Sequence, residues 1–195
     1  MSRVSRFGKR KKTITRTFRI RNEWDSVLQE EAARQGVSVN VLLNKLLRKY
    51  SLYSRWSNRN NDTSFSQRTL RGILKTVQVE SLAEAGTKSG ALDAINIVNS
   101  MGLTLDYESF VYLITEHLGG PHFARWFQCF HHTQGNKDIF HLQHDLGPKW
   151  SVFLEKYILA FLKSITDTEA TTRVYDYAIT LNVTRPKPKP TENPR

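Results

Sequence analysis

Residues 13–50 read TITRTFRIRNEWDSVLQEEAARQGVSVNVLLNKLLRKY, and two kinds of periodicity follow one another in this stretch. In its first nine residues, apolar and polar side chains alternate, as in a strand with one apolar face. The apolar positions of this strand are Ile14, Phe18 and Ile20. Beyond it, apolar residues recur at helical spacing in two runs separated by Gly36. The stretch therefore predicts a short strand followed by two helices.

Capping residues mark where the two helices begin and end. Asn22 is the predicted N-cap of the first helix, which we expect over about 23–35. Gly36 suits the left-handed backbone conformation that often follows a helix end. Ser38 is the predicted N-cap of the second helix, expected over about 39–53.

A single strand cannot satisfy its own edges, so this strand must pair with a second copy of the chain. The order of strand, helix, glycine turn with serine, and second helix over residues 13–56 resembles the ribbon-helix-helix family of DNA-binding proteins. The resemblance implies that two chains pair their strands antiparallel and that the resulting ribbon lies in the DNA major groove. Many members of the family have Pro at the strand-to-helix junction, where this chain has Asn22 and Glu23.

The resemblance also implies which side chains contact DNA. Thr15, Thr17 and Arg19 are the candidate base contacts, because Arg pairs with guanine and Thr can meet the thymine methyl group. The alternative is a solvated strand face. The candidate phosphate contacts are Arg21, the residues at the start of the second helix (Ser38, Val39 and Asn40), and the basic arm residues Lys9, Arg10, Lys11 and Lys12. Ser38 as a cap only, and the arm as a solubilising tail, are the simpler alternatives.

The net charge of the chain is concentrated in the same region. Residues 1–60 contain 15 Lys and Arg against four acidic residues, a net charge of +11, whereas residues 61–195 sum to zero. A polyanionic partner explains this concentration, because each neutralised phosphate releases counterions. A solubilising or membrane-surface element is the alternative.

Composition divides the chain into five segments. They are a disordered basic arm (1–12), the ribbon-helix-helix module (13–56), a polar linker (57–66), a second domain (67–184) and a disordered Pro- and Lys-containing tail (185–195). No apolar run approaches the roughly 20 residues of a membrane helix, and the N-terminus lacks the apolar stretch of a secretion signal. We therefore expect a cytoplasmic, nucleoid-associated protein without a membrane partner.

The second domain combines helical and strand patterns. Helices are expected over 81–102 and 107–119, with a turn at Gly102. Two β-rich runs flank Gly135-Asn136, which is a good hairpin signal, and a single strand over 173–183 closes the domain.

A long amphipathic helix lies between the hairpin and the closing strand. Pro148 fits its first turn, and Asp145 is a plausible cap. Residues 69–77, after the potential cap Ser66, are too short and ambiguous to assign. The sequence therefore predicts an α+β domain with a small antiparallel sheet covered by helices on one face. This domain resembles no family that we recognise.

All six histidines lie between residues 117 and 144, with Cys129 among them, and this clustering raises the question of a metal site. If Gly135-Asn136 is a two-residue turn, Cys129 lies opposite Leu142 and His131 opposite Phe140.

This pairing sorts the candidate metal ligands by sheet face. Cys129, His131 and His144 would share one face, and His132 and His141 the other. Such a group could bind nickel, zinc or copper, and nickel-responsive ribbon-helix-helix regulators carry an α+β sensing domain. The spacing in HHTQGNKDIFHLQH does not match theirs, so packed or surface histidines are favoured and we expect neither a metal nor another cofactor.

No nucleophile–base pair, P-loop or paired-carboxylate motif stands out, so an enzyme is not expected. The leading hypothesis is a transcriptional regulator, acting as a repressor, that binds double-stranded DNA as a homodimer or higher even oligomer. Its second domain would bind a small ligand, a partner protein or another copy. The alternatives are an antitoxin-like protein, a metal-responsive regulator and a nonspecific architectural nucleic-acid-binding protein.

Overall fold

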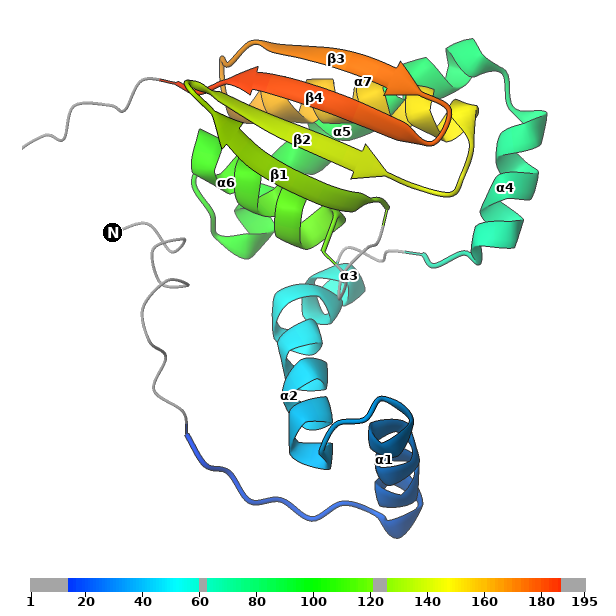
Figure 1. The fold of residues 1–195 in the computed structure, drawn as a ribbon, viewed down its shortest axis with the longest axis vertical. Helices are drawn as coiled ribbons and strands as arrows, with labels where there is room; N and C mark the ends of the chain where they lie inside the picture. The colour runs from blue at the N-terminus through cyan, green and yellow to red at the C-terminus, as the bar shows by residue number, and fades with distance from the viewer. Residues whose placement is uncertain (1–13, 60–62, 121–125, 187–195) are drawn as a thin grey trace, which may run out of the picture. The chain divides into compact units, whose positions relative to one another are not determined.

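A computed structural model describes residues 14–59, 63–120 and 126–186. The chain divides into two compact units, with the division between residues 62 and 63 (Figure 1). The first unit is helical, and the second combines helices with an antiparallel sheet. Within the described ranges, no helix is both long enough and apolar enough to cross a bilayer.

The first unit contains two helices that meet at a tight turn. α1 spans Asn22–Arg34, and α2 spans Val39–Lys49. A π-helical turn, Tyr50–Ser54, then leads into the short α3, Arg55–Arg59.

The predicted strand of residues 13–21 is not formed in the single chain. Residues 14–21 adopt neither helix nor strand, and residue 13 lies outside the described residues. A strand needs a neighbour to accept and donate its ladder hydrogen bonds, and the predicted neighbour belongs to a second copy. The paired ribbon therefore stays a prediction.

The start of α1 differs from the prediction by one residue. Asn22 is the first helical residue, and Arg21 is the N-cap, without a side-chain capping bond. The Arg21 carbonyl instead accepts from the backbone N–H groups of Trp24 and Asp25, at 3.1 and 3.0 Å. Glu23 and Asp25 in the first turn interact favourably with the positive end of the helix dipole, which offsets the missing cap.

The turn between α1 and α2 confirms the prediction from Gly36 and Ser38. Gly36 has φ +63°, and the backbone N–H groups of Gly36 and Val37 donate to the carbonyls of Ala33 and Ala32. These two bonds form a Schellman motif, which needs the left-handed conformation that glycine adopts without strain. The Ser38 hydroxyl oxygen accepts from the backbone N–H of Val41 at 3.3 Å and caps α2.

The helical segment after Ser38 is longer than expected. Helix was predicted to end near residue 53, but it continues through the π-helical turn into α3, so the first residues of the predicted linker 57–66 are helical. Neither Gly nor Pro occurs between Gly36 and Gly72, so the sequence lacks the residues that most strongly end a helix. The polar residues 57–59 were therefore mistaken for the start of a loop.

The second unit starts with helices and ends with two hairpins around a long helix. Its elements are α4 (Gln67–Thr76), α5 (Val79–Met101), α6 (Tyr107–Tyr112), a π-helical turn (Leu113–Leu118), β1 (Gln128–Gln134), β2 (Lys137–Gln143), α7 (Pro148–Ile165), β3 (Ala170–Tyr175) and β4 (Ala178–Thr184). The predicted hairpin, with Cys129 opposite Leu142 and His131 opposite Phe140, is confirmed. The predicted turn at Gly102 is also confirmed, with φ +63°.

Two predicted helix caps in this unit had different outcomes. The Ser66 hydroxyl oxygen accepts from the backbone N–H of Thr69 at 3.1 Å, so Ser66 caps α4. Pro148 is in the first turn of α7, as predicted, but Asp145 is not its cap. Gly147 holds the N-cap position with φ +89°, a conformation that disfavours any residue with a Cβ atom.

The closing strand was predicted as one piece, and this was wrong. Residues 170–184 form a hairpin, β3 and β4, that turns at Asp176 and Tyr177. Val174 pairs with Ile179, so these two residues share a face, whereas a continuous strand would place them on opposite faces. The turn contains no glycine, and its residues continue the alternating pattern, which hid it in the sequence.

The sheet has the strand order β1-β2-β4-β3, and every neighbouring pair is antiparallel. α7 packs against its inner face and α5 packs on α7, both on the same side of the sheet (Figure 1). The core between these layers includes fully buried Phe140, Leu142, Leu181, Leu154, Tyr157 and Phe161. The predicted α+β architecture, with helices covering one face, is thus confirmed.

Two glycines set the distance between α5 and α7. A Cβ atom at Gly86 would lie 2.4 Å from the Phe153 carbonyl oxygen, and one at Gly90 would lie 2.1 Å from the Tyr157 carbonyl oxygen. Real Cβ atoms do not approach backbone that closely. The short distance between the two helices therefore requires glycine at both positions.

Replacing Gly90 should destabilise the protein although alanine favours helix. Gly90→Ala should lower the free energy of unfolding by roughly 1–3 kcal/mol, because α7 backbone must move away. Gly72→Ala in α4 is the matched control, since a Cβ atom there meets nothing within 4 Å, and it should stabilise by about 0.5–1 kcal/mol. Chemical denaturation of the full chain measures both. Equal stabilisation by the two substitutions would contradict the close helix contact.

Candidate nucleic-acid interface

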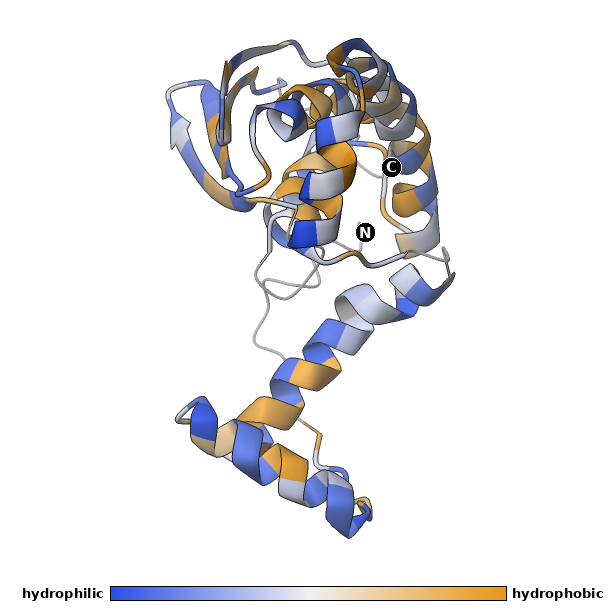
Figure 2. Ribbon diagram, turned by 90° about the vertical axis from the view of Figure 1, so that its right-hand side faces the viewer, coloured by the Kyte–Doolittle hydropathy of each residue, from blue (hydrophilic) through white to orange (hydrophobic). Residues whose placement is uncertain are grey.

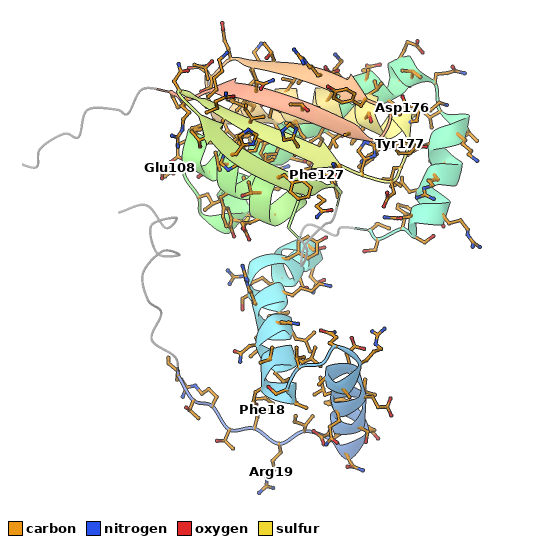
Figure 3. All side chains as sticks on the ribbon, viewed as in Figure 1. Phe18, Arg19, Glu108, Phe127, Asp176 and Tyr177 are labelled. Carbon is orange, nitrogen blue, oxygen red and sulfur yellow. The ribbon has the colours of Figure 1, made fainter. Side chains whose placement is uncertain are left out.

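The three predicted base contacts lie together on the segment before α1. Thr15, Thr17 and Arg19 are all exposed. Figure 3 shows Phe18 and Arg19 pointing to opposite sides of this segment, in keeping with the alternation in the sequence. In the single chain, the polar side chain of Arg19 and the apolar side chain of Phe18 therefore already lie on different sides of this segment.

The apolar side chains of the first unit are largely exposed in the single chain. Ile14 is 72% exposed and Phe18 59%, and Figure 2 shows apolar bands on α1 and α2 as well. The large apolar side chains exposed on the two helices and the turn after them are Trp24, Val27, Val41, Leu46, Leu47 and Tyr50. Among the side chains described between residues 14 and 59, only Ala32 and Leu42 are buried. The described residues of this unit therefore leave most of their large apolar side chains exposed.

The first turn of α2 combines the predicted phosphate contacts. Ser38 and Asn40 are exposed, and Val39 begins the helix. No acidic residue lies in the first turn, and the helix dipole places partial positive charge there. The Ser38 side chain already caps the helix, so a phosphate would meet backbone N–H groups rather than replace the cap.

The remaining predicted phosphate contacts differ in what surrounds them. The guanidinium of Arg21 lies 3.5 Å from the Glu23 carboxylate and 5.2 Å from the ring centre of Trp24. Both charged side chains of this pair are mostly exposed, so the ion pair is weak and a phosphate could compete for Arg21. Lys9, Arg10, Lys11 and Lys12 lie outside the described residues.

The metal candidates Cys129, His131 and His144 are not assembled into a binding site. Within the described ranges, no group of three or more His, Cys, Asp or Glu side chains is placed to hold a metal ion. Burial raises the pKa of the Cys129 thiol to about 12, which disfavours the thiolate that metals bind.

His144 has a structural role instead. Its Nδ1 accepts from the Leu146 backbone N–H, so the neutral ring carries its proton on Nε2 and donates to the Ser151 hydroxyl at 2.9 Å. That hydroxyl donates to the Asp176 carbonyl at 3.2 Å. The ring thereby connects the end of β2, the start of α7 and the β3–β4 turn. Burial lowers the pKa of His144 to about 4, although the Asp145 carboxylate acts in the opposite direction.

His131 also belongs to a hydrogen-bond network, centred on the fully buried carboxylate of Asp138. The carboxylate accepts from Thr133 Oγ1 at 2.6 Å, from His131 Nε2 at 3.1 Å, from the Tyr107 hydroxyl at 2.8 Å and from Arg185 Nε at 3.0 Å. Burial alone would raise the pKa of Asp138, but these bonds and the Arg185 charge outweigh it, so the pKa is lowered.

The Asp138 network joins β1, β2, α6 and the residue after β4, and sequence reasoning missed it. Both carboxylate oxygens are occupied by donors, so this acid is suited to holding elements together rather than to proton transfer. Its only sequence signal was an acidic residue at an inward position of a strand, and a strand pattern alone did not reveal its partners.

The other two histidines of the hairpin lie on the opposite sheet face, as predicted. The rings of His132 and His141 stack with their centres 5.6 Å apart and their planes at 22°. They border a shallow hollow of about 300 Å³ on the face that the helices leave uncovered.

Comparisons of this chain with family models, with curated proteins and with solved structures found no match.

The role of His144 predicts an acid-sensitive fold. Its pKa is about 4 in the folded chain against 6.5 for an ordinary histidine, so below pH 6.5 protons bind the unfolded state preferentially. As the pH falls from 6.5 to 4, unfolding should become easier by up to roughly 3 kcal/mol. Urea titrations across this range should show a smaller loss for His144→Gln and the parental loss for His132→Gln, whose ring is exposed. Identical pH dependence in all three proteins would refute this role.

Proposed function

We propose that this protein is a DNA-binding transcriptional regulator of the ribbon-helix-helix kind. Its first 56 residues form a dimer that reads the major groove with a two-stranded β-ribbon, and occupancy of a promoter represses transcription. The observation that carries the proposal is the exposed apolar surface of residues 14–50 beside an alternating polar, basic face.

The exposed apolar surface supports the dimer. Burying a side chain of the size of Phe or Ile is worth about 1.5–3 kcal/mol, so the exposed positions of two copies provide a substantial driving force. Antiparallel pairing of two segments 14–21 would direct Ile14 and Phe18 of both copies to the same side, against the helices. The polar side chains would then face outward.

The outward face has the chemistry of a DNA contact. A two-stranded ribbon fits the major groove, where Arg19 can donate two hydrogen bonds to guanine and Thr15 and Thr17 can contact thymine or accept from bases. Backbone N–H groups at the start of α2 fit a phosphate that fixes the register. The net charge of +11 on residues 1–60 favours association with any duplex and adds salt dependence without specificity.

The dimer is tested by breaking its apolar side. Phe18→Asp should convert the full-length chain from dimer to monomer in sedimentation velocity, because a carboxylate cannot be buried between two copies without a partner. Arg19→Asp is the matched control. Residue 19 is next to Phe18, but its side chain points to the opposite side of the segment, so this substitution should leave the dimer intact. A dimer that survives Phe18→Asp, or a parent chain that is monomeric, would refute the ribbon.

Base reading is tested at Arg19. Selection from a randomised duplex library should yield a preferred site, bound over random duplex by a ratio above about a thousand at fixed salt. Arg19→Ala should reduce this ratio roughly 10- to 100-fold, because a bidentate contact to guanine is lost.

The controls separate specificity from charge. Arg34→Ala removes another exposed arginine, at the end of α1, where it pairs with Glu31, and should keep the specificity ratio. Deletion of residues 2–12 should weaken all duplexes alike and flatten the salt dependence. If Arg19→Ala weakens preferred and random duplexes by the same factor, the base contact does not exist.

A further inference from the structure

The second unit has a sheet face that its own helices leave open. By strand register, the side chains on this outer sheet face alternate with those buried against α7. One row across the sheet runs Phe130, His141, Thr180 and Arg173. Neighbouring strands lie about 4.8 Å apart, so this row extends over roughly 14 Å.

Rings are unusually prominent on the outer sheet face. Phe130 is 47% exposed and Tyr175 53%, although strands in water usually turn such rings inward. His141, on the central strand β2, lies between them in strand order, and its ring stacks with that of His132 on the edge strand β1. His141 Nδ1 lies 3.1 Å from Thr180 Oγ1, which helps to fix the ring.

The outward positions of the four strands, which all belong to the described part of the chain, carry cations but no acidic side chain. Lys137 and Arg173 project from the outer sheet face, and its remaining positions carry amide, hydroxyl, imidazole or apolar groups. Asp138, the acidic residue of these strands, points to the inner side, where the network described above neutralises it. This charge distribution is complementary to an anion, even though residues 61–195 have no net charge.

We propose that the outer sheet face binds single-stranded nucleic acid. Every base has a flat face that can stack on Phe130, Tyr175 or the histidine rings, and the shallow hollow between His141, Arg173 and Tyr175 has room for one base or sugar. Arg173 and Lys137 would contact the phosphates. This binding is separate from duplex recognition by the first unit, and neither proposal depends on the other.

Other occupants fit the outer sheet face less well. A second copy packed face to face would bring Arg173 and Lys137 of both chains together without acidic partners. A duplex hides its base faces inside the stack, so exposed rings would gain little from it. Three metal ligands are not brought together at this face in the described part of the chain.

The experiment uses the full chain and a short fluorescein-labelled oligo(dT), with binding measured by anisotropy at a salt concentration that suppresses purely electrostatic binding. Tyr175→Ala and Phe130→Ala should each weaken binding about tenfold, because a stacking partner is lost. Tyr177→Ala is the matched control, since Tyr177 is 58% exposed but lies in the β3–β4 turn (Figure 3), and it should bind as the parent does. An abasic oligonucleotide of equal length should bind at least tenfold more weakly than oligo(dT).

Three results would overturn the proposal. One is equal affinity for oligo(dT) and the abasic strand. This result would mean that basic side chains elsewhere in the protein bind the phosphates without any stacking of bases. Another is an equal effect of Tyr175→Ala and Tyr177→Ala. The third is a change of oligomeric state in Tyr175→Ala with unchanged oligo(dT) binding, which would assign the face to a second copy. Duplex selectivity, measured on the same variants, should be unaffected, so failure here leaves the ribbon proposal standing.

Discussion

The close approach of α5 and α7 is the constraint on which the second unit depends. Gly86 and Gly90 let α5 rest on the backbone of α7 at Phe153 and Tyr157, closer than any side chain would permit. The two helices then cover the inner face of the sheet as stacked layers, and their apolar residues fill the core with Phe140 and its neighbours. Because both helices lie on that side, the outer face stays open and its chemistry is available to a partner.

Polar contacts hold the two hairpins to α7, to α6 and to each other. His144 and Ser151 connect the end of β2, the start of α7 and the carbonyl of Asp176 in the second turn. Asp138 accepts from four donors, which lie on β1, on α6 and directly after β4. Two of the candidate metal ligands are thereby used for structure. A cluster of histidines in the sequence carries no information about which ones already have partners.

In the first unit the helices form, but most of their large apolar side chains are not covered by other residues of the unit. The Schellman turn and the Ser38 cap fix α1 and α2 locally, and each helix has one buried residue, Ala32 and Leu42 respectively. Phe18, Trp24 and Leu47 remain in water in the single chain. Local hydrogen bonds define these helices, but among the described side chains of the unit only Ala32 and Leu42 are buried. For this reason the proposed function rests on association.

What the sequence by itself determined here was local. The Gly36-Ser38 turn, the Gly135-Asn136 hairpin with its register, and the start of α7 at Pro148 depend on backbone conformations of a few neighbouring residues, and they were predicted correctly. The tertiary structure alone decided the β3–β4 hairpin, the glycine contact between α5 and α7, the Asp138 network and the open sheet face. Each of these depends on groups far apart in the chain that meet only after folding, and a pattern of neighbours cannot encode a distance between such groups.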